Sequence, residues 1–438
     1  MASFRVGWDR ALSSSCPGER RKVKESRWSL SPAQYSILLS TSSSMFLWGI
    51  IASIGPLAAS GKLVSALSPI LKVTVLLVGP LFLLIGNLAV GVMSDRIGRK
   101  KMFMVTMLAY GIGLLLVVIS TYFFSFPGLI MGLALSEFGI GGEEPPSLSL
   151  LTENFSTDSR AFFITFSTNF ANAGAAFISG LLLIIPSAYT SFAMLGTATA
   201  ILLILVVVRF SVPESFRWLK EKGRFDEAKK ELSRLKIPEE GLNIRHPGYV
   251  VPLIALILMG ISQYLTYGLM SFVIGPYEFP STSFDEEIIL FSNLGATVGG
   301  IIAAYLINAF SRKFFAMWTF IGGLLTTAVI GLLSYKLSDP LVFFPLLFIN
   351  MVMSEFAWAA RVTLEPESFP TRFRGTAVGI IRIFPIAAYE ASIYFTSGLN
   401  LTQYIAYNFV LWCIGVVGAG LWAKKGFETK GVSPDYLV

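Results

Sequence analysis

The chain has 438 residues, of which 54% are hydrophobic and only 14% are charged, and its mean hydropathy is +0.68. Soluble domains carry about 45–50% apolar and about 25% charged residues, so a soluble interior is too small for this much apolar surface. The composition indicates a protein dissolved largely in lipid and excludes a soluble enzyme, a DNA-binding domain and a disulfide scaffold. One His and two Cys (Cys16 and Cys413) exclude an ordinary Cys/His zinc site, so no metal and no cofactor is expected.

Twelve apolar runs, most of them long enough to cross a hydrocarbon layer as helices, divide into two groups of six. They cover residues 34–58, 70–93, 102–125, 127–151, 161–186 and 190–211, and then 248–274, 288–309, 314–336, 340–364, 374–397 and 402–423. The pattern predicts an all-α membrane protein with twelve transmembrane helices in two six-helix bundles, 34–211 and 247–424. A tail (1–33), a polar linker (212–246) and a second tail (425–438) complete the chain. Apolar residues at helical spacing predict short amphipathic helices in the linker.

The basic residues are distributed very unequally between the two sides of these spans. Of the 34 Lys and Arg residues, all but five fall in the tails, the linker and the loops of one side, with Arg209 and Arg374 counted there because they lie at the adjoining ends of their spans. The exceptions are Lys62, Lys72 and Lys336 on the other side and Arg361 and Arg382 inside spans. Because basic loops stay in the cytoplasm, both termini are expected there, in a multi-pass protein of the plasma membrane. The pI near 9.3 therefore reflects topology, and nucleic acid is not expected as a partner.

The two halves of the chain are related by a weak internal repeat. A shift of 213–214 residues places Asp95–Lys100 on Asn308–Lys313 and Pro213-Glu214 on Phe427-Glu428. The same shift places Glu153 and Arg160 on Glu367 and Arg374. Two halves in the same orientation predict a parallel repeat about an axis along the membrane normal.

The stretches around these positions resemble the major facilitator superfamily and, within it, the sugar porters. Gly91-Val-Met-Ser-Asp95-Arg96-Ile-Gly98-Arg99-Lys100-Lys101 is similar to the superfamily's loop between helices two and three. Residues 213–219, 367–375 and 427–431 are similar to sugar-porter sequences after helices six, ten and twelve. The resemblance implies a secondary active transporter that works by alternating access, that is not an enzyme, and that we expect to function as a monomer.

In sugar porters the corresponding charged positions lock the two halves together at the cytoplasmic side. The resemblance therefore implies a gate in which charges pair when the inner side closes and are solvated when it opens. An exposed ion pair contributes only about 0–1 kcal/mol, so several must act together. The alternative is that these charges only set the topology. The candidate gate residues are Gly91, Asp95, Arg96, Gly98, Arg99, Glu153, Arg160, Glu214, Arg217, Glu367, Arg374 and Glu428.

Ionisable residues at membrane depth predict a cavity lining, an ion pair or a proton site, because an ionised group at a helix centre costs about 2.5–3.5 kcal/mol. Glu137, Glu143 and Glu144 are the candidates for proton coupling, and Glu137 and Glu144 share one helix face. The stretch 141–146, Gly-Gly-Glu-Glu-Pro-Pro, predicts a helix break. For Glu143 and Glu144 the alternative is a cap or a pair near the interface. Arg382 could bind a substrate carboxylate or phosphate, or equally neutralise a buried glutamate.

Neutral polar and aromatic residues on several spans form a candidate solute site. Aromatic rings stack on sugars and amides bond hydroxyl groups, so this set suits a sugar or a related metabolite. Each residue alone can also serve helix packing. The set is Gln263, Tyr267, Asn169, Asn293, Asn350 and Trp358, together with Arg382.

The candidate site also departs from proton-coupled sugar porters. The first span carries no acid, and Leu133 stands where the resemblance leads us to expect an arginine. Proton coupling is then either absent or moved to Glu137 or Glu144. The leading prediction is a transporter of a small polar solute, a sugar or related metabolite. It is expected to contact membrane lipid, and whether protons are a co-substrate is left open. Alternatives are a carrier for a carboxylate or other organic anion through Arg382, and a non-transporting nutrient sensor.

Overall fold

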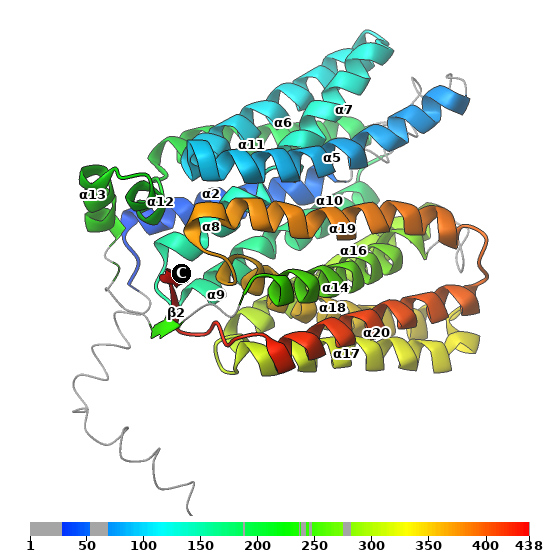
Figure 1. Cartoon of the computed structure of the whole chain (residues 1–438). Coiled ribbons are helices and arrows are strands. Elements are labelled where there is room, and N and C mark those ends of the chain that lie inside the picture. The colour runs from blue at the N-terminus through cyan, green and yellow to red at the C-terminus, as the bar shows by residue number, and fades with distance from the viewer. Residues whose placement is uncertain are drawn as a thin grey trace, which may run out of the picture.

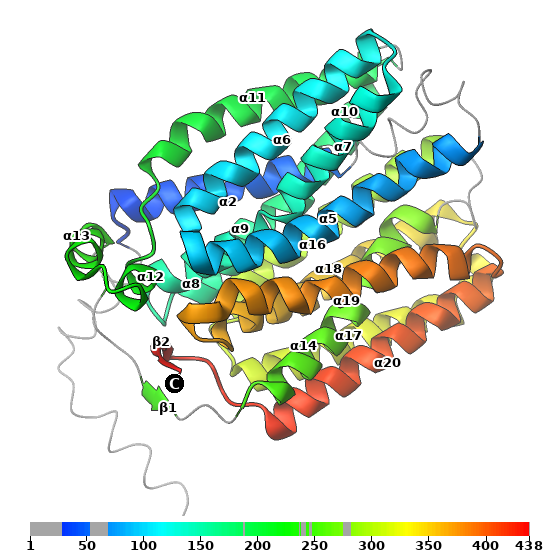
Figure 2. The ribbon, with the colours of Figure 1, turned by 45° about the horizontal axis from the view of Figure 1, so that its top comes forward.

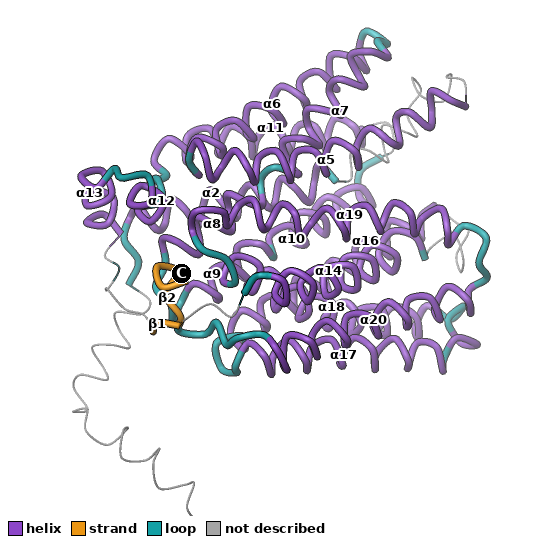
Figure 3. Tube along the Cα trace, viewed as in Figure 1, coloured by secondary structure: helices purple, strands orange, loops and turns teal. Residues whose placement is uncertain are grey.

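The structure is a computed structural model that describes residues 29–52, 69–186, 189–235, 237, 242–244, 248–274 and 282–437. Cys16, Lys62, most of the first tail and parts of the linker 212–246 lie outside the described residues. Within the described ranges, nine helices are long and apolar enough to cross a membrane. With the shorter and interrupted helices they form twelve passes in two bundles, which confirms the predicted fold class (Figures 1 and 3).

Some helices of the first bundle begin at short polar capping residues, and one pass is interrupted at glycines. Ser31 and Gln34 form a capping box at the start of the first helix, and Ser125 caps the fourth pass. That pass is interrupted between Gly141 and Glu144, as predicted, and the fifth is interrupted at Asn169, which was not predicted. The helices are α2 (Pro32–Ile51), α5 (Pro69–Ile97), α6 (Arg99–Tyr122), α7 (Phe126–Gly141), α8 (Glu144–Asn154), α9 (Arg160–Thr168), α10 (Phe170–Ile184) and α11 (Thr190–Ser211).

The second bundle repeats this order with fewer interruptions. Ser311, Asp339 and Asn400 cap three of its helices through their side-chain oxygens. The helices are α14 (Val250–Gly268), which continues into the π-helical turn η2 (Leu269–Val273), α16 (Thr282–Leu306), α17 (Arg312–Leu332), α18 (Pro340–Glu367), α19 (Arg374–Thr396) and α20 (Leu401–Lys425). Single turns of 3₁₀ helix, η3 (Ser334–Lys336) and η4 (Thr371–Phe373), precede α18 and α19.

The linker and the second tail lie together at one end of the molecule, which we call the linker end (Figure 1). The linker forms the short helices α12 (Phe216–Glu221) and α13 (Phe225–Leu235). Strand β1 (Leu242–Ile244) of the linker pairs in parallel with β2 (Val432–Leu437) of the tail. This pairing was not predicted, because a strand of three residues is too short to show an alternating pattern.

The two bundles meet along two equivalent helix pairs. Helix α5 packs along α19, and α10 packs along α16. By the repeat, α16 is the counterpart of α5 and α19 is the counterpart of α10, so the interface is reciprocal. At the linker end, buried apolar residues of both bundles form one cluster, in which Leu148, Leu151 and Phe163 join Ala304, Val362 and Val378. Helices α5 and α19 separate towards the opposite end in both views (Figures 1 and 2).

Glycines make the close approach at the linker end sterically feasible. A Cβ atom added at Gly91 of α5 would lie 2.5 Å from the carbonyl oxygen of Gly375 at the start of α19. A Cβ atom added at Gly375 would lie 2.7 Å from the carbonyl oxygen of Gly91. These neighbours are backbone atoms, which cannot rotate away as a side chain can. The closed linker end therefore depends on the absence of side chains at this crossing.

We expect Gly91→Ala to open the linker end, because overpacking of this kind costs about 1–3 kcal/mol. The measurement is alkylation by N-ethylmaleimide of a Val378→Cys variant whose native Cys16 and Cys413 are replaced by serine. Val378 is fully buried between the bundles, and its replacement should react about tenfold faster after Gly91→Ala. The matched control is Gly180→Ala, whose Cβ atom would meet, among the described residues, only a leucine methyl group at 3.6 Å. An unchanged rate in Gly91→Ala would contradict the steric argument.

Candidate functional site

A buried glutamate of the first bundle binds arginines from both bundles at the linker end. Glu153 of α8 accepts hydrogen bonds from Arg99 of α6, with Nε to Oε2 at 3.1 Å and Nη2 to Oε1 at 2.9 Å. It also accepts one from Arg374 of α19, with Nη1 to Oε1 at 2.5 Å. All three side chains are 0% exposed. Arg217 of α12 donates to the backbone carbonyl of Glu153, so the linker joins the same contact.

A glutamate of the second bundle makes the equivalent contacts in reverse. Glu367 of α18 accepts hydrogen bonds from Arg312 of its own bundle, with Nε to Oε2 at 3.2 Å, and from Arg160 of the first bundle, with Nε to Oε1 at 2.7 Å. The hydroxyl of Thr429 in the tail donates to Glu367 at 2.5 Å. Each bundle thus supplies one glutamate, one arginine for itself and one arginine for its partner. We call these two glutamates and four arginines the linker-end network.

Asp95 adds a cross-bundle contact that the repeat does not duplicate. Its carboxylate lies at the end of α5, where Oδ1 accepts the N–H of Gly375 at 3.1 Å and Oδ2 accepts the N–H and the hydroxyl of Thr376, both at 2.7 Å. A carboxylate at the start of α19 is favoured by the exposed N–H groups and by the helix dipole. The counterpart Asn308 accepts a hydrogen bond from an arginine of its own bundle at 3.3 Å and none across the bundles within the described residues. The closed end is therefore not fully symmetric.

Glu214 of the linker and Glu428 of the tail each bind the start of a helix in the bundle that precedes them in the chain. Glu214 accepts the N–H groups of the first two residues of α6 at 3.0 and 3.2 Å, and Glu428 does the same for α17 at 2.9 and 3.4 Å. Burial raises the pKa of the Glu214 carboxyl above its ordinary value, against the opposing effect of these N–H groups. Gly98 has a φ of +121° and lies against Glu214, so this position requires glycine. Arg96 is exposed and, among the residues described, makes no ion pair.

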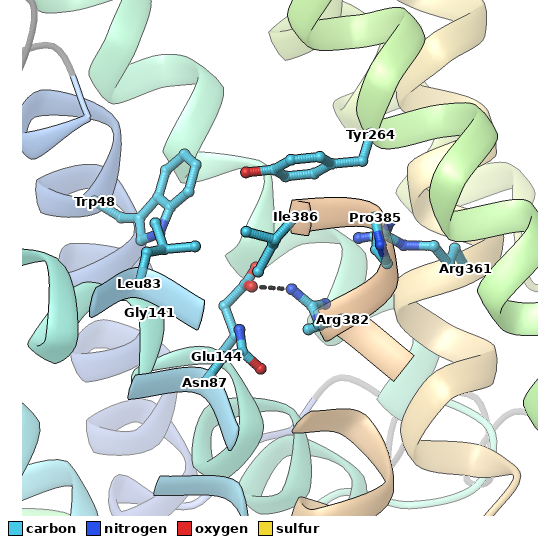
Figure 4. Close-up of a pocket in the computed structure, with 10 residues that line it drawn as sticks. All are labelled: Trp48, Leu83, Asn87, Gly141, Glu144, Tyr264, Arg361, Arg382, Pro385 and Ile386. Carbon is cyan, nitrogen blue, oxygen red and sulfur yellow. Dashed lines mark hydrogen bonds and ion pairs between the residues drawn. The ribbon is translucent and has the colours of Figure 1, made fainter. Parts of the chain in front are cut away.

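A second charged cluster lies deeper in the membrane, about 12 Å along α19 from Arg374 at 1.5 Å per residue. The Nε and Nη2 atoms of Arg382 lie 2.9 and 2.8 Å from Oε2 of Glu365 on α18, and Nη1 donates to Glu144 of α8 (Figure 4). Arg361, one turn before Glu365, pairs with it at 3.1 Å. Both guanidinium groups lie over the ring of Trp358, at 4.4 and 5.1 Å from its centroid.

This cluster borders a small cavity between the two bundles. Its volume of about 20 Å³ holds roughly one water molecule, so a metabolite fits only if the bundles separate here. The Asn87 side chain is 1% exposed, and its Oδ1 atom has no hydrogen-bond partner within the described ranges. The Tyr264 hydroxyl points across the cavity towards Trp48 (Figure 4). The lining residues are Trp48, Leu83, Asn87, Gly141 and Glu144 of the first bundle and Tyr264, Arg361, Arg382, Pro385 and Ile386 of the second.

Most of the neutral residues that the sequence suggested for solute binding bond to other helices. Asn350 donates to two threonines of α17 at 3.0 Å each. Tyr267 donates to Asn293 at 2.6 Å, and Asn169 donates to a backbone carbonyl of α16 at 2.9 Å. Gln263 is buried with its Oε1 atom unpartnered in the described structure, and it is not one of the residues that line the cavity. Of the residues that the sequence suggested for solute binding, Arg382 lines the cavity in the described structure.

The three acidic candidates for proton coupling occupy different environments. Glu144 lines the cavity, whereas Glu143 accepts hydrogen bonds from Arg209 of α11 and from the hydroxyl of Thr106 inside the first bundle. Arg209, which the sequence places among the basic residues of the linker side, is fully buried in this pair. Glu137 is buried and makes no ion pair within the part of the chain that the structure describes.

Some residues of these clusters were missed although the sequence carried a signal for them. Arg312 is aligned with Arg99 by the repeat, which predicts an equivalent role. Arg361 and Glu365 are four residues apart, the spacing at which a helix brings opposite charges together. For Asn87 and Tyr264 no sequence pattern pointed to the cavity, because their positions depend on which helix faces meet in the fold.

The fold and the clusters together define a class of protein: a multi-pass membrane transporter, built from two repeated six-helix bundles with a charged, buried site between them. The profile of the Major Facilitator Superfamily matches residues 37–384, and the chain belongs to this superfamily. It is a transporter of small-molecule solutes and not an enzyme.

Curated relatives support this assignment over much of the chain. YaaU of Escherichia coli (strain K12), named for metabolite transport, is 28% identical and covers 91% of this chain and 93% of its own length. The shikimate transporter of the same organism is 26% identical and covers 69% and 71%. The minor myo-inositol transporter IolF of Bacillus subtilis (strain 168) is 24% identical and covers 68% of both chains.

Solved structures show the same fold. The proton:xylose symporter XylE, bound to 6-bromo-6-deoxy-D-glucose, superposes with a TM-score of 0.74 over 92% of this chain and 98% of that chain, at 15% identity. The transporter FucP in its outward conformation superposes with a TM-score of 0.64 over 87% and 97%, at 12% identity. Identities this low carry the fold and not the substrate.

Proposed function

We propose that the chain moves a small polar metabolite across the plasma membrane by alternating access, with both termini and the linker in the cytoplasm. The reciprocal linker-end network carries this proposal, because each glutamate holds an arginine of the opposite bundle. Such a network joins the bundles when this end is closed and can be hydrated when it opens. The excess of Lys and Arg on this side supports its placement in the cytoplasm. The conformation described here is then closed to the cytoplasm.

The energetics of buried ion pairs suit a switch. Desolvation of the six charged groups offsets most of their mutual attraction, so a closed network differs little in free energy from a hydrated one. A transporter needs two conformations of similar free energy, since a strongly preferred one would stop the cycle. The alternative that these charges only set the topology does not explain why Glu153 and Glu367 are buried between arginines of both bundles.

The cluster around Arg382 supports coupling to protons. The contact between Glu144 and Arg382 joins the two bundles inside the membrane, so a change in the protonation of Glu144 acts directly on the relation between them. Relatives named for shikimate, myo-inositol and niacin transport support a small, ring-shaped polar metabolite, which includes the sugar-like solutes and the carboxylates that the sequence left open. Both sides of the site come from one chain, which supports function as a monomer surrounded by lipid.

Uptake into proteoliposomes tests this proposed function. The full chain is reconstituted and supplied with radiolabelled myo-inositol, shikimate or nicotinate, with and without a gradient that makes the outside acidic. We expect at least one solute to accumulate several-fold over protein-free liposomes, and a protonophore to abolish the accumulation. Uptake that ignores the gradient would contradict proton coupling. Failure of every solute to enter or to exchange would contradict transport itself and favour the sensor alternative.

A further inference from the structure

We propose that the substrate is a small monocarboxylate, and that Glu144 occupies its place on Arg382 in the empty transporter. When Glu144 takes up a proton it leaves Arg382, and the substrate carboxylate replaces it. This inference rests on the proposed transport function and specifies its substrate class. It also predicts that one proton and one substrate anion cross together.

The two glutamates bound to Arg382 differ in the way that this exchange requires. Glu365 is 0% exposed and is held by Arg361 as well as Arg382, with both arginines in the second bundle. Glu144 is 12% exposed, lines the cavity and comes from the opposite bundle. It lies at the first turn of α8, directly after the break that ends α7. Separation of the bundles therefore removes Glu144 from Arg382 and leaves Glu365 in place.

The charges of the cluster explain why the substrate is a monoanion. Two arginines and two carboxylates sum to zero, and a net charge at this depth is unfavourable. Protonation of Glu144 alone leaves one excess positive charge, and a bound monocarboxylate cancels it. A neutral solute leaves the positive charge uncompensated, and a dianion produces a negative one. The proton comes from the solution in contact with the open cavity and is released after the bundles open on the other side.

The remaining charged groups near Glu144 are paired elsewhere or lie further away. On α18 and α14 the neighbours are Arg361, Glu365 and Tyr264. Glu355, also on α18, is buried about 9 Å along that helix from Arg361, at 1.5 Å per residue. Glu143 is paired with Arg209, and Asp95, Arg99 and Arg160 of α5, α6 and α9 belong to the linker end. Glu137 of α7 precedes Glu144 by seven residues, and Glu390 of α19 follows Arg382 by eight. At 1.5 Å per residue, each lies about 10–12 Å further towards the opposite end of the molecule. Glu144 is therefore the acid whose protonation most directly frees Arg382.

The cavity lining gives the rest of the substrate its chemistry. The buried, unpartnered Oδ1 atom of Asn87 can accept a hydrogen bond from a hydroxyl or N–H group of the solute. The rings of Trp48 and Tyr264 border the same space and suit the faces of a small ring. The site thus fits a ring that carries one carboxylate and, away from it, at least one hydrogen-bond donor.

Binding to the purified full chain tests the inference with two matched pairs of probes, shikimate with methyl shikimate and nicotinate with nicotinamide. The members of each pair differ in charge but hardly in shape. We expect the acid of at least one pair to bind at least tenfold more tightly than its neutral partner. Its Kd should rise about tenfold per pH unit once Glu144 is deprotonated, because one proton is linked to binding. In proteoliposomes, uptake of that acid should follow the pH gradient and ignore a potential set with potassium and valinomycin.

The variant Glu144→Gln separates this mechanism from others. Glutamine imitates the protonated acid, so the acid should bind with a Kd that no longer depends on pH, and should exchange without being accumulated by a pH gradient. Glu144→Asp keeps a carboxylate and should restore the pH dependence, which shows that the site is folded. The exposed Glu227 offers a control, since Glu227→Gln should match the wild type.

Three outcomes would overturn the inference: equal binding of the neutral partners, absence of binding by both acids, or a pH dependence lost in Glu137→Gln but kept in Glu144→Gln. Transport of myo-inositol or nicotinamide by the wild type would overturn it while still supporting the proposed transport function. Absence of all transport would instead count against the transport function.

Discussion

Replacing Glu153 with glutamine is expected to shift the protein strongly towards a conformation open at the linker end. The change removes the partner of two arginines, Arg99 and Arg374, that are 0% exposed. Removal of one member of a buried ion pair costs about 3–5 kcal/mol, because the remaining charge is left uncompensated. Opening hydrates these arginines and relieves the cost. The ratio of open to closed conformations should therefore rise by roughly a hundredfold to a few thousandfold.

The alkylation rate of the Val378→Cys variant reports this shift. In the Glu153→Gln background it should increase far more than in the Glu227→Gln background, where the same substitution affects an exposed pair on α13. By the repeat, Glu367→Gln should have a similar effect, since it leaves Arg160 and Arg312 without their partner. An alkylation rate that stays at the wild-type value in both variants would show that the network does not hold the bundles together.

Replacing Arg382 with glutamine is expected to abolish transport and to lower stability. The substitution leaves Glu144 without its partner and removes one of the two arginines that hold Glu365. Truncation of a buried charged partner costs about 2–5 kcal/mol, which corresponds to a loss of uptake on the order of a hundredfold. Uptake is measured with the solute that the wild type transports, and stability is measured as the temperature at which the detergent-solubilised protein aggregates.

A second substitution separates the loss of stability from the loss of transport. The double variant Arg382→Gln with Glu144→Gln contains no unpaired carboxylate at this position, because Arg361 still holds Glu365. We expect it to recover most of the lost thermal stability and none of the uptake. Arg372→Gln, at an exposed position on the turn η4, is the matched control and should retain both. Recovered uptake in the double variant would exclude Arg382 as a binding residue.

The features predicted well from the sequence are those that local patterns specify. The lengths of the hydrophobic runs predicted the passes, and the glycines and prolines of residues 141–146 indicated the break before Glu144. The repeated Glu153–Arg160 and Glu367–Arg374 spacings indicated four of the six charged residues of the linker-end network, because two copies of one local pattern are unlike chance. Contacts between the copies, such as Arg160 with Glu367, followed only from the packing of α5 on α19 and α10 on α16.

The candidate site was harder to predict because one residue type serves two purposes in a membrane. An amide at membrane depth can bind a solute or another helix, and Asn350 and Asn169 do the latter. Arg382 presented the same ambiguity, and its partners Glu144 and Glu365 depend on which helix faces meet. The strand pair β1–β2 could not be predicted, because residues 242–244 are too few to show an alternating pattern.

The reciprocity of the linker-end network has an evolutionary consequence. Because Glu153 with Arg160 and Glu367 with Arg374 are two copies of one arrangement, an ancestral half-length protein could have formed the same bonds by dimerising with itself. Duplication and fusion of its gene would preserve these bonds, and no new contact would be needed. The contacts that lack a counterpart, Asp95 with Thr376 and Glu144 with Arg382, could arise only after fusion let the copies diverge. The properties that distinguish this transporter from others of its fold, including its substrate specificity, are thus expected at contacts that the repeat does not duplicate.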